Sequence, residues 1–367
     1  ALCFANGVGA FPDPEEAFAR FTAVAEAHPE LVETSLQLGW CYEHASGVDK
    51  RDSVKAAAHF RSGAARNNAA CMCQLGLLYL CGHGVDQRDR AEAFRWLRRA
   101  ADLGDAQAQC RLAVVLAEPS ADGIEQNMRR SMALLRGAAR RGYPPAFGVL
   151  AERYMLGLGV EADAAKAVQL YRIGAGMGDP DACVALGKCY FDGNGVVQDP
   201  EEGVRWFKRA ADTGSARGEL ALARAYSSGR GIARDKKRAA RLVRVAAEQE
   251  LPEAQCELAR MYTKGKGVEK DEAEALRWYR RAAEQGSAEA QFYIGLCYRD
   301  GTGMSAPNPI EAANWYRRAA TSGFAQAQCQ MGYCYQKGVG VDQDVEESVR
   351  WYRMSAEQGY PLALFNM

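Results

Sequence analysis

The sequence predicts an all-α protein, a right-handed superhelical solenoid of about nine helix–turn–helix repeats. Three observations predict it: an apolar residue followed by a small one recurs along the chain, a glycine-rich turn follows, and a second amphipathic segment comes after the turn. The recurring apolar residues are Leu38, Leu75, Leu112, Leu150, Leu186, Leu222, Leu258, Ile294 and Met331, at intervals of 36 to 38 residues. One such unit cannot bury its own apolar face, so stacked neighbours must bury it.

The first predicted helix of each repeat carries an apolar stripe. In one copy, Ala254, Leu258 and Tyr262 follow one another at four-residue spacing, which places them on one helical face. The residue after the leucine, here Ala259, is always Gly or Ala, which lets a neighbouring helix approach closely. The tyrosine recurs in every repeat except the third, where Leu116 replaces it.

A Gly-x-Gly-Val turn, such as that at 265–268, ends the first helix in most repeats. Glycine tolerates positive φ there, and since phosphate-binding glycine loops follow a strand, we interpret these glycines as structural. Asp199, Pro200 and Glu202 then give the capping pattern of a second helix. That helix is predicted to end at a left-handed C-cap, supplied by Gly104, Gly142, Gly178, Gly214, Gly286, Gly323, Gly359 or, in the first repeat, Asn67.

The repeat pattern also predicts the organisation of the chain. Residues 1–33 form a partial repeat with only its second helix, residues 34–362 form nine repeats, and residues 363–367 begin a truncated tenth. Because solenoid ends need polar caps, we expect a longer array or covered ends. The third repeat lacks the glycine turn, and the residues from Ala117 to Gln126 predict a distorted turn and a bend.

Composition excludes several classes of function. Lys and Arg total 46 against 46 Asp and Glu, so no global field attracts nucleic acid or an anionic membrane. No apolar run approaches the roughly 18–20 residues of a membrane span. We therefore expect protein partners, no nucleic acid and no direct membrane insertion. Twelve cysteines are too few for a disulfide scaffold, which favours an intracellular, reducing compartment, the cytoplasm first and an organelle as the alternative.

The cysteines raise a zinc alternative, because Cys41, His44, Cys81 and His83 lie in adjacent repeats together with Cys71 and Cys73. However, the positions of Cys41 and Cys73 are occupied by cysteines without nearby histidines in other repeats. Free cysteine behaves as a small buried hydrophobe, so we predict reduced, mostly buried thiols. Cys73, Cys110, Cys256 and Cys329 share one such position. The sequence predicts no metal, no cofactor and no catalytic residue.

The segments AQFYIGLCYRDGTG at 290–303 and LRWYRRAAEQGSAEAQ at 276–291 resemble the Sel1-like repeat, a relative of the tetratricopeptide repeat. The resemblance covers residues 13–367. It implies a protein–protein interaction scaffold or an adaptor subunit of a larger multiprotein assembly. The alternative is a regulatory subunit that controls an enzyme such as a ubiquitin ligase, and a catalytic role comes third.

By analogy with the tetratricopeptide fold, residues two, five and six after the repeat leucine should line a partner groove. In the first four repeats they include the apolar residues Trp40, Leu77, Leu80, Val114, Met155 and Leu156. Later they include the basic residues Lys188, Arg224, Arg260, Lys264, Arg299 and Lys337, interrupted by Asp192 and Asp300. We expect a partner with apolar anchors at one end and acidic residues at the other. Unconstrained surface variation, with Trp40 packed near the N-terminal end, remains the alternative.

A second candidate surface is a basic run in the sixth repeat. Its candidate docking residues are Arg230, Arg234, Lys237, Arg238 and Arg241, and the run also contains Lys236 and Arg244. They form either a solvated helix face or a docking patch for an acidic protein or RNA segment. The run has no aromatic residues for base stacking, which disfavours RNA.

Overall fold

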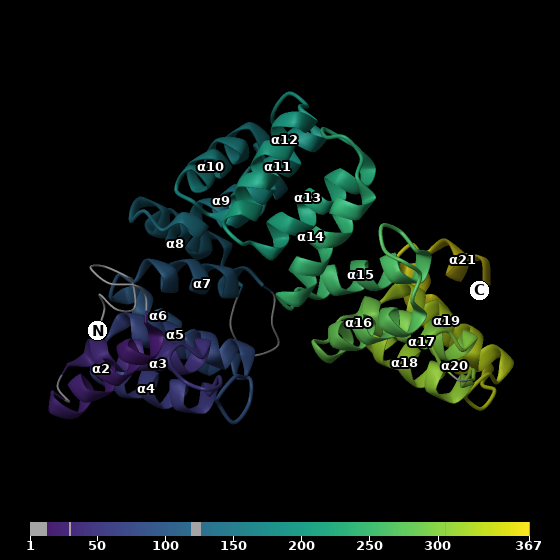
Figure 1. The fold of residues 1–367 in the computed structure, drawn as a ribbon, viewed down its shortest axis with the longest axis horizontal. Coiled ribbons are helices and arrows are strands. Elements are labelled where there is room, and N and C mark those ends of the chain that lie inside the picture. Colours follow the sequence, from purple (N-terminus) through teal and green to yellow (C-terminus); the bar gives the residue numbers. More distant parts are fainter. Residues whose placement is uncertain (1–12, 29–30, 119–125, 305, 367) are drawn as a thin grey trace. The chain divides into compact units, whose positions relative to one another are not determined.

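The computed structural model describes residues 13–28, 31–118, 126–304 and 306–366. Over these residues the chain forms twenty α-helices and no strand, which confirms the predicted all-α fold (Figure 1). The first helices of the repeats are α3 (Val32–His44), α5 (Ala69–Cys81), α7 (Ala106–Ala117), α9 (Pro144–Leu156), α11 (Pro180–Asp192), α13 (Ala216–Ser228), α15 (Pro252–Lys264), α17 (Ala288–Asp300), α19 (Ala325–Lys337) and α21 (Pro361–Asn366). The second helices are α2 (Pro14–Ala27), α4 (Ser53–Ala65), α6 (Arg90–Asp102), α8 (Met128–Arg140), α10 (Ala164–Gly176), α12 (Pro200–Asp212), α14 (Lys236–Glu248), α16 (Glu272–Glu284), α18 (Pro309–Thr321) and α20 (Val345–Glu357).

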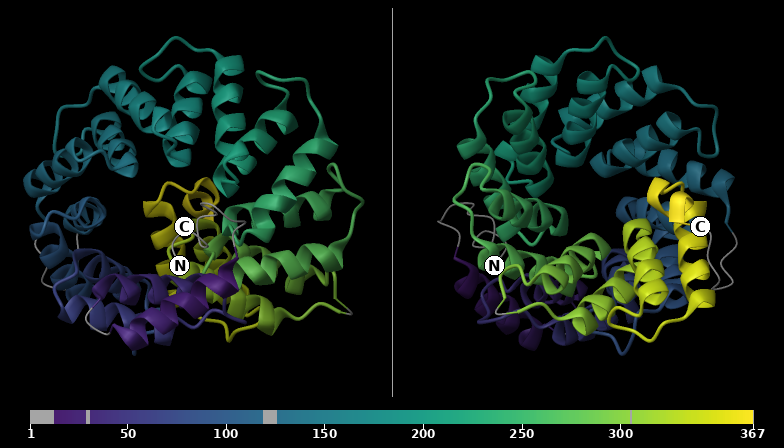
Figure 2. Two further views of the ribbon diagram at one scale, coloured as in Figure 1. Left: turned by 60° about the vertical axis from the view of Figure 1, so that its left-hand side comes forward. Right: turned by 90° about the vertical axis from the view of Figure 1, so that its right-hand side faces the viewer.

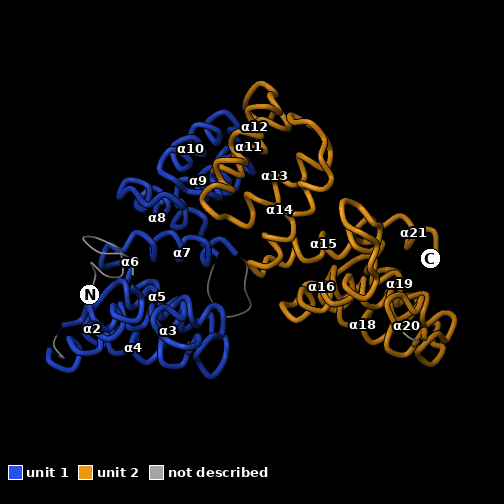
Figure 3. The backbone as a smooth tube through the Cα atoms, in the orientation of Figure 1, with its two compact units in different colours: residues 1–182 blue, residues 183–367 orange. Residues whose placement is uncertain are grey.

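The chain divides into two compact units, residues 1–182 and 183–367 (Figure 3). Inside each unit, consecutive helices pack on one another: α5 on α6 and α6 on α7 in the first unit, α15 on α16 and α16 on α17 in the second. Figure 2 shows this succession of helix pairs from two further sides. Packing between nearest neighbours is the arrangement that a helix-pair solenoid requires.

The repeat leucines form the core, as their spacing predicts. Leu75 and Leu112 are fully buried in one cluster of the first unit, together with Leu97 from the intervening second helix. The small residue after the leucine has a matching role: a Cβ on Gly295 would lie 2.5 Å from the ring of Tyr316. Only glycine lets α17 and α18 approach this closely.

The turns follow the predicted chemistry. The Asp199 carboxylate accepts a hydrogen bond from the Glu202 amide at 3.0 Å and so caps α12. Every predicted C-cap has positive φ, including Asn67 at 67°. The second glycine of the Gly-x-Gly turn docks against the preceding repeat, because a Cβ on Gly340 would overlap the carbonyl oxygen of Pro309 at the start of α18. This contact explains the motif without any ligand.

The predicted ends are described only in part. Asp13 caps α2, the second helix expected near the start of the chain, and the prediction that no first helix precedes it concerns residues 1–12, which lie outside the described residues. The six-residue α21 lies where the tenth repeat is expected to begin. The middle of the third repeat's turn, 119–125, lies outside the described residues, so the distorted turn and the bend stay predictions. Of the helices that the structure describes, none combines the length and the apolar character needed to cross a membrane.

Candidate partner-binding surfaces

The predicted apolar positions lie on four first helices of the first unit. Helices α3, α5, α7 and α9 contact one another in succession, in addition to their contacts with second helices. Trp40 on α3 is 40% exposed and Leu156 on α9 is 60% exposed. Leu77, Leu80, Val114 and Met155 are half-buried, and the two leucines pack against the core. Trp40 is therefore partly exposed to solvent, and the partner groove stays a prediction beside the alternative of unconstrained surface variation.

The predicted basic positions of the second unit contain an ion-pair ladder. The Arg224 Nε donates to Glu257 Oε2 at 2.9 Å, which links α13 to α15. Arg260 on α15 lies 4.0 Å from the same oxygen and donates from its Nη1 to Glu289 Oε1 on α17 at 2.9 Å. These two arginines tie successive first helices together, so they are not unpaired cations awaiting an acidic partner.

Arg299 is also paired, since its guanidinium donates two hydrogen bonds to the carboxylate of the adjacent Asp300, at 2.7 and 2.9 Å. This contact lowers the pKa of Asp300. By contrast, Lys188, Lys264 and Lys337 are exposed and form no ion pair with any residue that the structure describes. The sequence pattern did not separate the ion-paired arginines from these lysines. A carboxylate on the next first helix, such as Glu257, could have indicated which cations are paired.

The basic run of the sixth repeat likewise contains some residues that have partners within the fold and others that have none among the described residues. The Arg230 guanidinium lies 5.1 Å from the ring centroid of Phe191 and 3.9 Å from Asp192 Oδ1. Arg234 Nε donates to the Ser227 carbonyl at 3.0 Å. The guanidinium of Arg238 lies over the Tyr226 ring, 4.8 Å from its centroid. These three arginines hold the turn in place.

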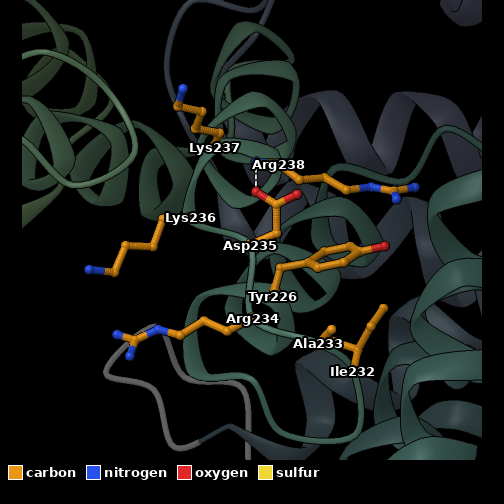
Figure 4. A pocket seen from close by; sticks show the side chains of 8 residues that line it. All are labelled: Tyr226, Ile232, Ala233, Arg234, Asp235, Lys236, Lys237 and Arg238. Carbon is orange, nitrogen blue, oxygen red and sulfur yellow. Dashed lines mark hydrogen bonds between the residues drawn. The ribbon is translucent and has the colours of Figure 1, made fainter.

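An open pocket of about 830 Å³ lies at this turn, between α13 and α14. Its lining residues are Tyr226, Ile232, Ala233, Arg234, Asp235, Lys236, Lys237 and Arg238 (Figure 4). In Figure 4 the Lys236 and Lys237 side chains project away from the ring of Tyr226. Lys236, Lys237 and Arg241 are exposed and, within the described part of the chain, have no carboxylate partner. Lys236 was absent from the predicted docking residues, because only the pocket shows that it shares this surface.

The cysteines are packing residues, as predicted. Of the eleven free cysteines in the described chain, all but Cys81 are buried. Burial raises the pKa of Cys110 and of Cys256 to about 11, so both thiols stay protonated at neutral pH. His83, one of the residues of the zinc alternative, is exposed and lies 3.2 Å from Arg51 through its Nδ1. Across the described residues, no three His, Cys, Asp or Glu side chains gather in a way that could hold a metal ion.

Stacked helix pairs that pack on their nearest neighbours define a helical-repeat protein of the α-solenoid class. Such folds typically serve as non-catalytic scaffolds for other proteins. The chain belongs to the Sel1 repeat family, whose model matches residues 1–19, 34–68, 69–105, 106–143, 149–179, 180–215, 216–251, 252–287, 288–324 and 325–360. Family members are generally protein-interaction scaffolds.

Solved structures support this assignment. The chain is 30% identical to a protective antigen of uropathogenic Escherichia coli strains that displays an SLR fold, with 99% of this chain and 76% of that chain covered and a TM-score of 0.54. It is also 30% identical to a Sel1 repeat protein from Oxalobacter formigenes, with 83% and 87% covered and a TM-score of 0.55. Yeast Tom70, at 14% identity over 98% of this chain and 84% of that chain, shares the fold alone, with a TM-score of 0.51. A search of the curated proteins found no match.

Proposed function

We propose that the protein is an adaptor or scaffold subunit of a larger multiprotein assembly, and that a partner protein binds along the first helices of residues 1–182. The observation that carries this proposal is the exposure of Trp40 on α3 and Leu156 on α9, first helices whose other apolar residues are buried or half-buried. Exposed apolar side chains grouped on one surface mark interaction sites, and tryptophan is a frequent anchor of interfaces.

In this proposal, only some of the basic residues of the expected groove contact the partner. Arg224 and Arg260 are bonded to Glu257 and Glu289, so they position helices rather than attract a partner. The cations left for an acidic segment of the partner are Lys188, Lys264 and Lys337. The proposed apolar anchor therefore does not depend on the arginines.

The test is capture of partners from a lysate by the intact protein, with quantitative mass spectrometry. The Trp40→Ala/Leu156→Ala variant should lose a specific set of proteins that the wild type retains, at low and at high salt alike, because apolar burial is not screened by ions. The control is Val54→Ala/Leu103→Ala, which removes side chains that are 68% and 49% exposed on α4 and at the end of α6. Equal losses for both variants, or none for Trp40 and Leu156, would contradict the proposal.

The alternative is a regulatory subunit that controls an enzyme such as a ubiquitin ligase, and it would use the same surface. The two functions differ in what binding does to the captured protein. An adaptor leaves the turnover of a captured enzyme unchanged and raises its association with a third protein. A regulatory subunit changes the turnover itself, so assays of the captured enzyme with wild type and with Trp40→Ala/Leu156→Ala distinguish them.

A further inference from the structure

The pocket at the turn between α13 and α14 is strongly cationic. Arg234, Lys236, Lys237 and Arg238 are four of its eight lining residues, against the single carboxylate of Asp235. That carboxylate already caps α14, since it accepts a hydrogen bond from the Arg238 amide at 2.8 Å. The pocket therefore has a surplus of positive charge that no described residue balances.

The cations of the pocket fall into fixed and free groups. Arg238 lies over Tyr226, and Arg234 is hydrogen-bonded to the Ser227 carbonyl, so these two guanidiniums are held in place. Lys236 and Lys237 are exposed, and both project outward in Figure 4. Arg241, one helical turn after Lys237, adds another exposed cation on the same side of α14. Like charges at this spacing repel, so the arrangement does not stabilise the helix.

The other second helices of this unit carry the opposite charge at the same place. The first turns contain Glu201 and Glu202 in α12, Glu272 and Glu274 in α16, Glu311 in α18 and Glu346 and Glu347 in α20. Acidic residues there interact favourably with the helix dipole, whereas cations interact unfavourably. The first turn of α14 contains no acidic residue and begins Lys236, Lys237, Arg238. Helices α4, α8 and α10 of residues 1–182 also lack an acidic residue in the first turn, but among the described second helices three consecutive cations begin α14 alone. Such a departure from local electrostatic preference is a feature of functional sites.

We propose that this pocket and the adjoining exposed face of α14 bind an acidic segment of a partner polypeptide, whose Asp or Glu side chains contact Lys236, Lys237 and Arg241. The inference rests on the proposed function in one respect, that the partner is a protein. Carboxylates satisfy the free ammonium groups and remove the repulsion within the first turn of α14. The pocket does not suit single-stranded RNA, because its one ring, Tyr226, is 5% exposed and covered by Arg238, which leaves no face for base stacking.

The test is fluorescence anisotropy with a short labelled peptide rich in Asp and Glu, titrated with the intact protein at low and at physiological salt. The comparison probes are the same peptide with Asn and Gln in place of the acids, and a single-stranded RNA of equal length. We expect the acidic peptide to bind at least about tenfold more tightly than the amide peptide at low salt, and less so as salt screens the charges. Tighter binding of the RNA than of the acidic peptide, or no preference for the acidic peptide, overturns the proposal.

The decisive variant is Lys236→Glu/Lys237→Glu, which gives α14 the acidic first turn of its sisters and should therefore fold at least as well as the wild type. This variant should bind the acidic peptide about tenfold or more weakly than the wild type does at low salt. The matched control is Lys208→Glu/Arg280→Glu, which makes the same change of charge at exposed positions on α12 and α16. Retained affinity in the pocket variant, or an equal loss in the control, overturns the proposal.

This experiment is separable from the test of the apolar surface. Trp40 and Leu156 lie in the unit of residues 1–182, and the pocket lies in the unit of residues 183–367. Trp40→Ala/Leu156→Ala should therefore bind the acidic peptide with wild-type affinity. If the acidic peptide does not bind, the proposal of an apolar surface on residues 1–182 is not contradicted. If the capture experiment fails, the proposal of an acidic-segment site on α14 is not contradicted.

Discussion

At the residue scale, a set of buried glutamines connects neighbouring repeats. Gln255 and Gln328 each donate from Nε2 to a carbonyl at the end of the preceding second helix, Ala247 and Ala320, at 3.2 Å. In turn, Gln255 Oε1 accepts a hydrogen bond from Gln285 at 3.0 Å. Buried amides satisfied on both sides stabilise a fold, whereas unsatisfied ones cost free energy.

Glu219 occupies the same position with a carboxylate. It accepts from Gln249 Nε2 at 3.1 Å but, when ionised, has no proton to donate to the carbonyl of Ala211, the counterpart of Ala247. Burial raises the pKa of Glu219 above its ordinary value. Folding therefore favours the protonated acid, so this residue's contribution to stability is greatest below the unfolded pKa, about 4.3, and is lost as pH rises through the folded value.

We predict that Glu219→Gln raises the free energy of unfolding at neutral pH by about 1 kcal/mol, because the amide donates where the carboxylate cannot. The gain should shrink as pH falls toward about 4, where the wild-type acid is protonated. Urea unfolding at several pH values measures it. The reciprocal change Gln255→Glu should destabilise at neutral pH, and a Glu219→Gln variant no more stable than wild type would contradict this account.

At the element scale, the two glycines of the Gly-x-Gly turn have different structural roles. Both Gly338 and Gly340 have positive φ, at 65° and 72°. A Cβ on Gly338 would meet Gln343 at an ordinary 3.4 Å and nothing closer, whereas one on Gly340 would overlap the backbone of Pro309 in the preceding repeat. The first glycine ends a helix, and the second lets two repeats dock.

We predict that Gly338→Ala lowers the free energy of unfolding by about 1–2 kcal/mol, the cost of a left-handed residue with a side chain. Gly340→Ala should lower it by about 1–3 kcal/mol more, because the methyl group also forces two repeats apart. Thermal and urea unfolding of the two variants measure the difference. Equal losses would show that conformation alone, and not docking, selects the second glycine.

The helix boundaries, the caps and the buried residues could be predicted from the repeat spacing and from local capping residues such as Asp199 and Asn67. These features depend on residues only a few positions apart. The ion pair of Arg224 with Glu257 could not be predicted in this way, because the two residues lie 33 positions apart and meet only after two repeats stack. The exposure of Trp40 was likewise open until its neighbours were in place.

At the scale of the whole molecule, stability is the sum of contacts between neighbouring helices within each unit. The reactivity of the buried cysteines measures the opening of individual repeats. Ten of them are buried, and they lie on first helices from α3 to α19, so each thiol becomes reactive only when its own repeat opens. Cys81 is exposed and reports the intrinsic labelling rate.

We predict that pulsed thiol labelling in increasing urea, read out by peptide mass spectrometry, modifies the buried cysteines in an order set by position. Cys81 should react at once. In a chain of these 367 residues alone, Cys41 on α3 and Cys334 on α19 should follow at lower urea than Cys110 and Cys256, because α3 and α19 then lie near the ends of the stack and have fewer neighbours to hold them closed. Simultaneous labelling of all buried thiols would contradict this order and would indicate that coupling between neighbouring repeats is strong enough for the array to open as one cooperative block.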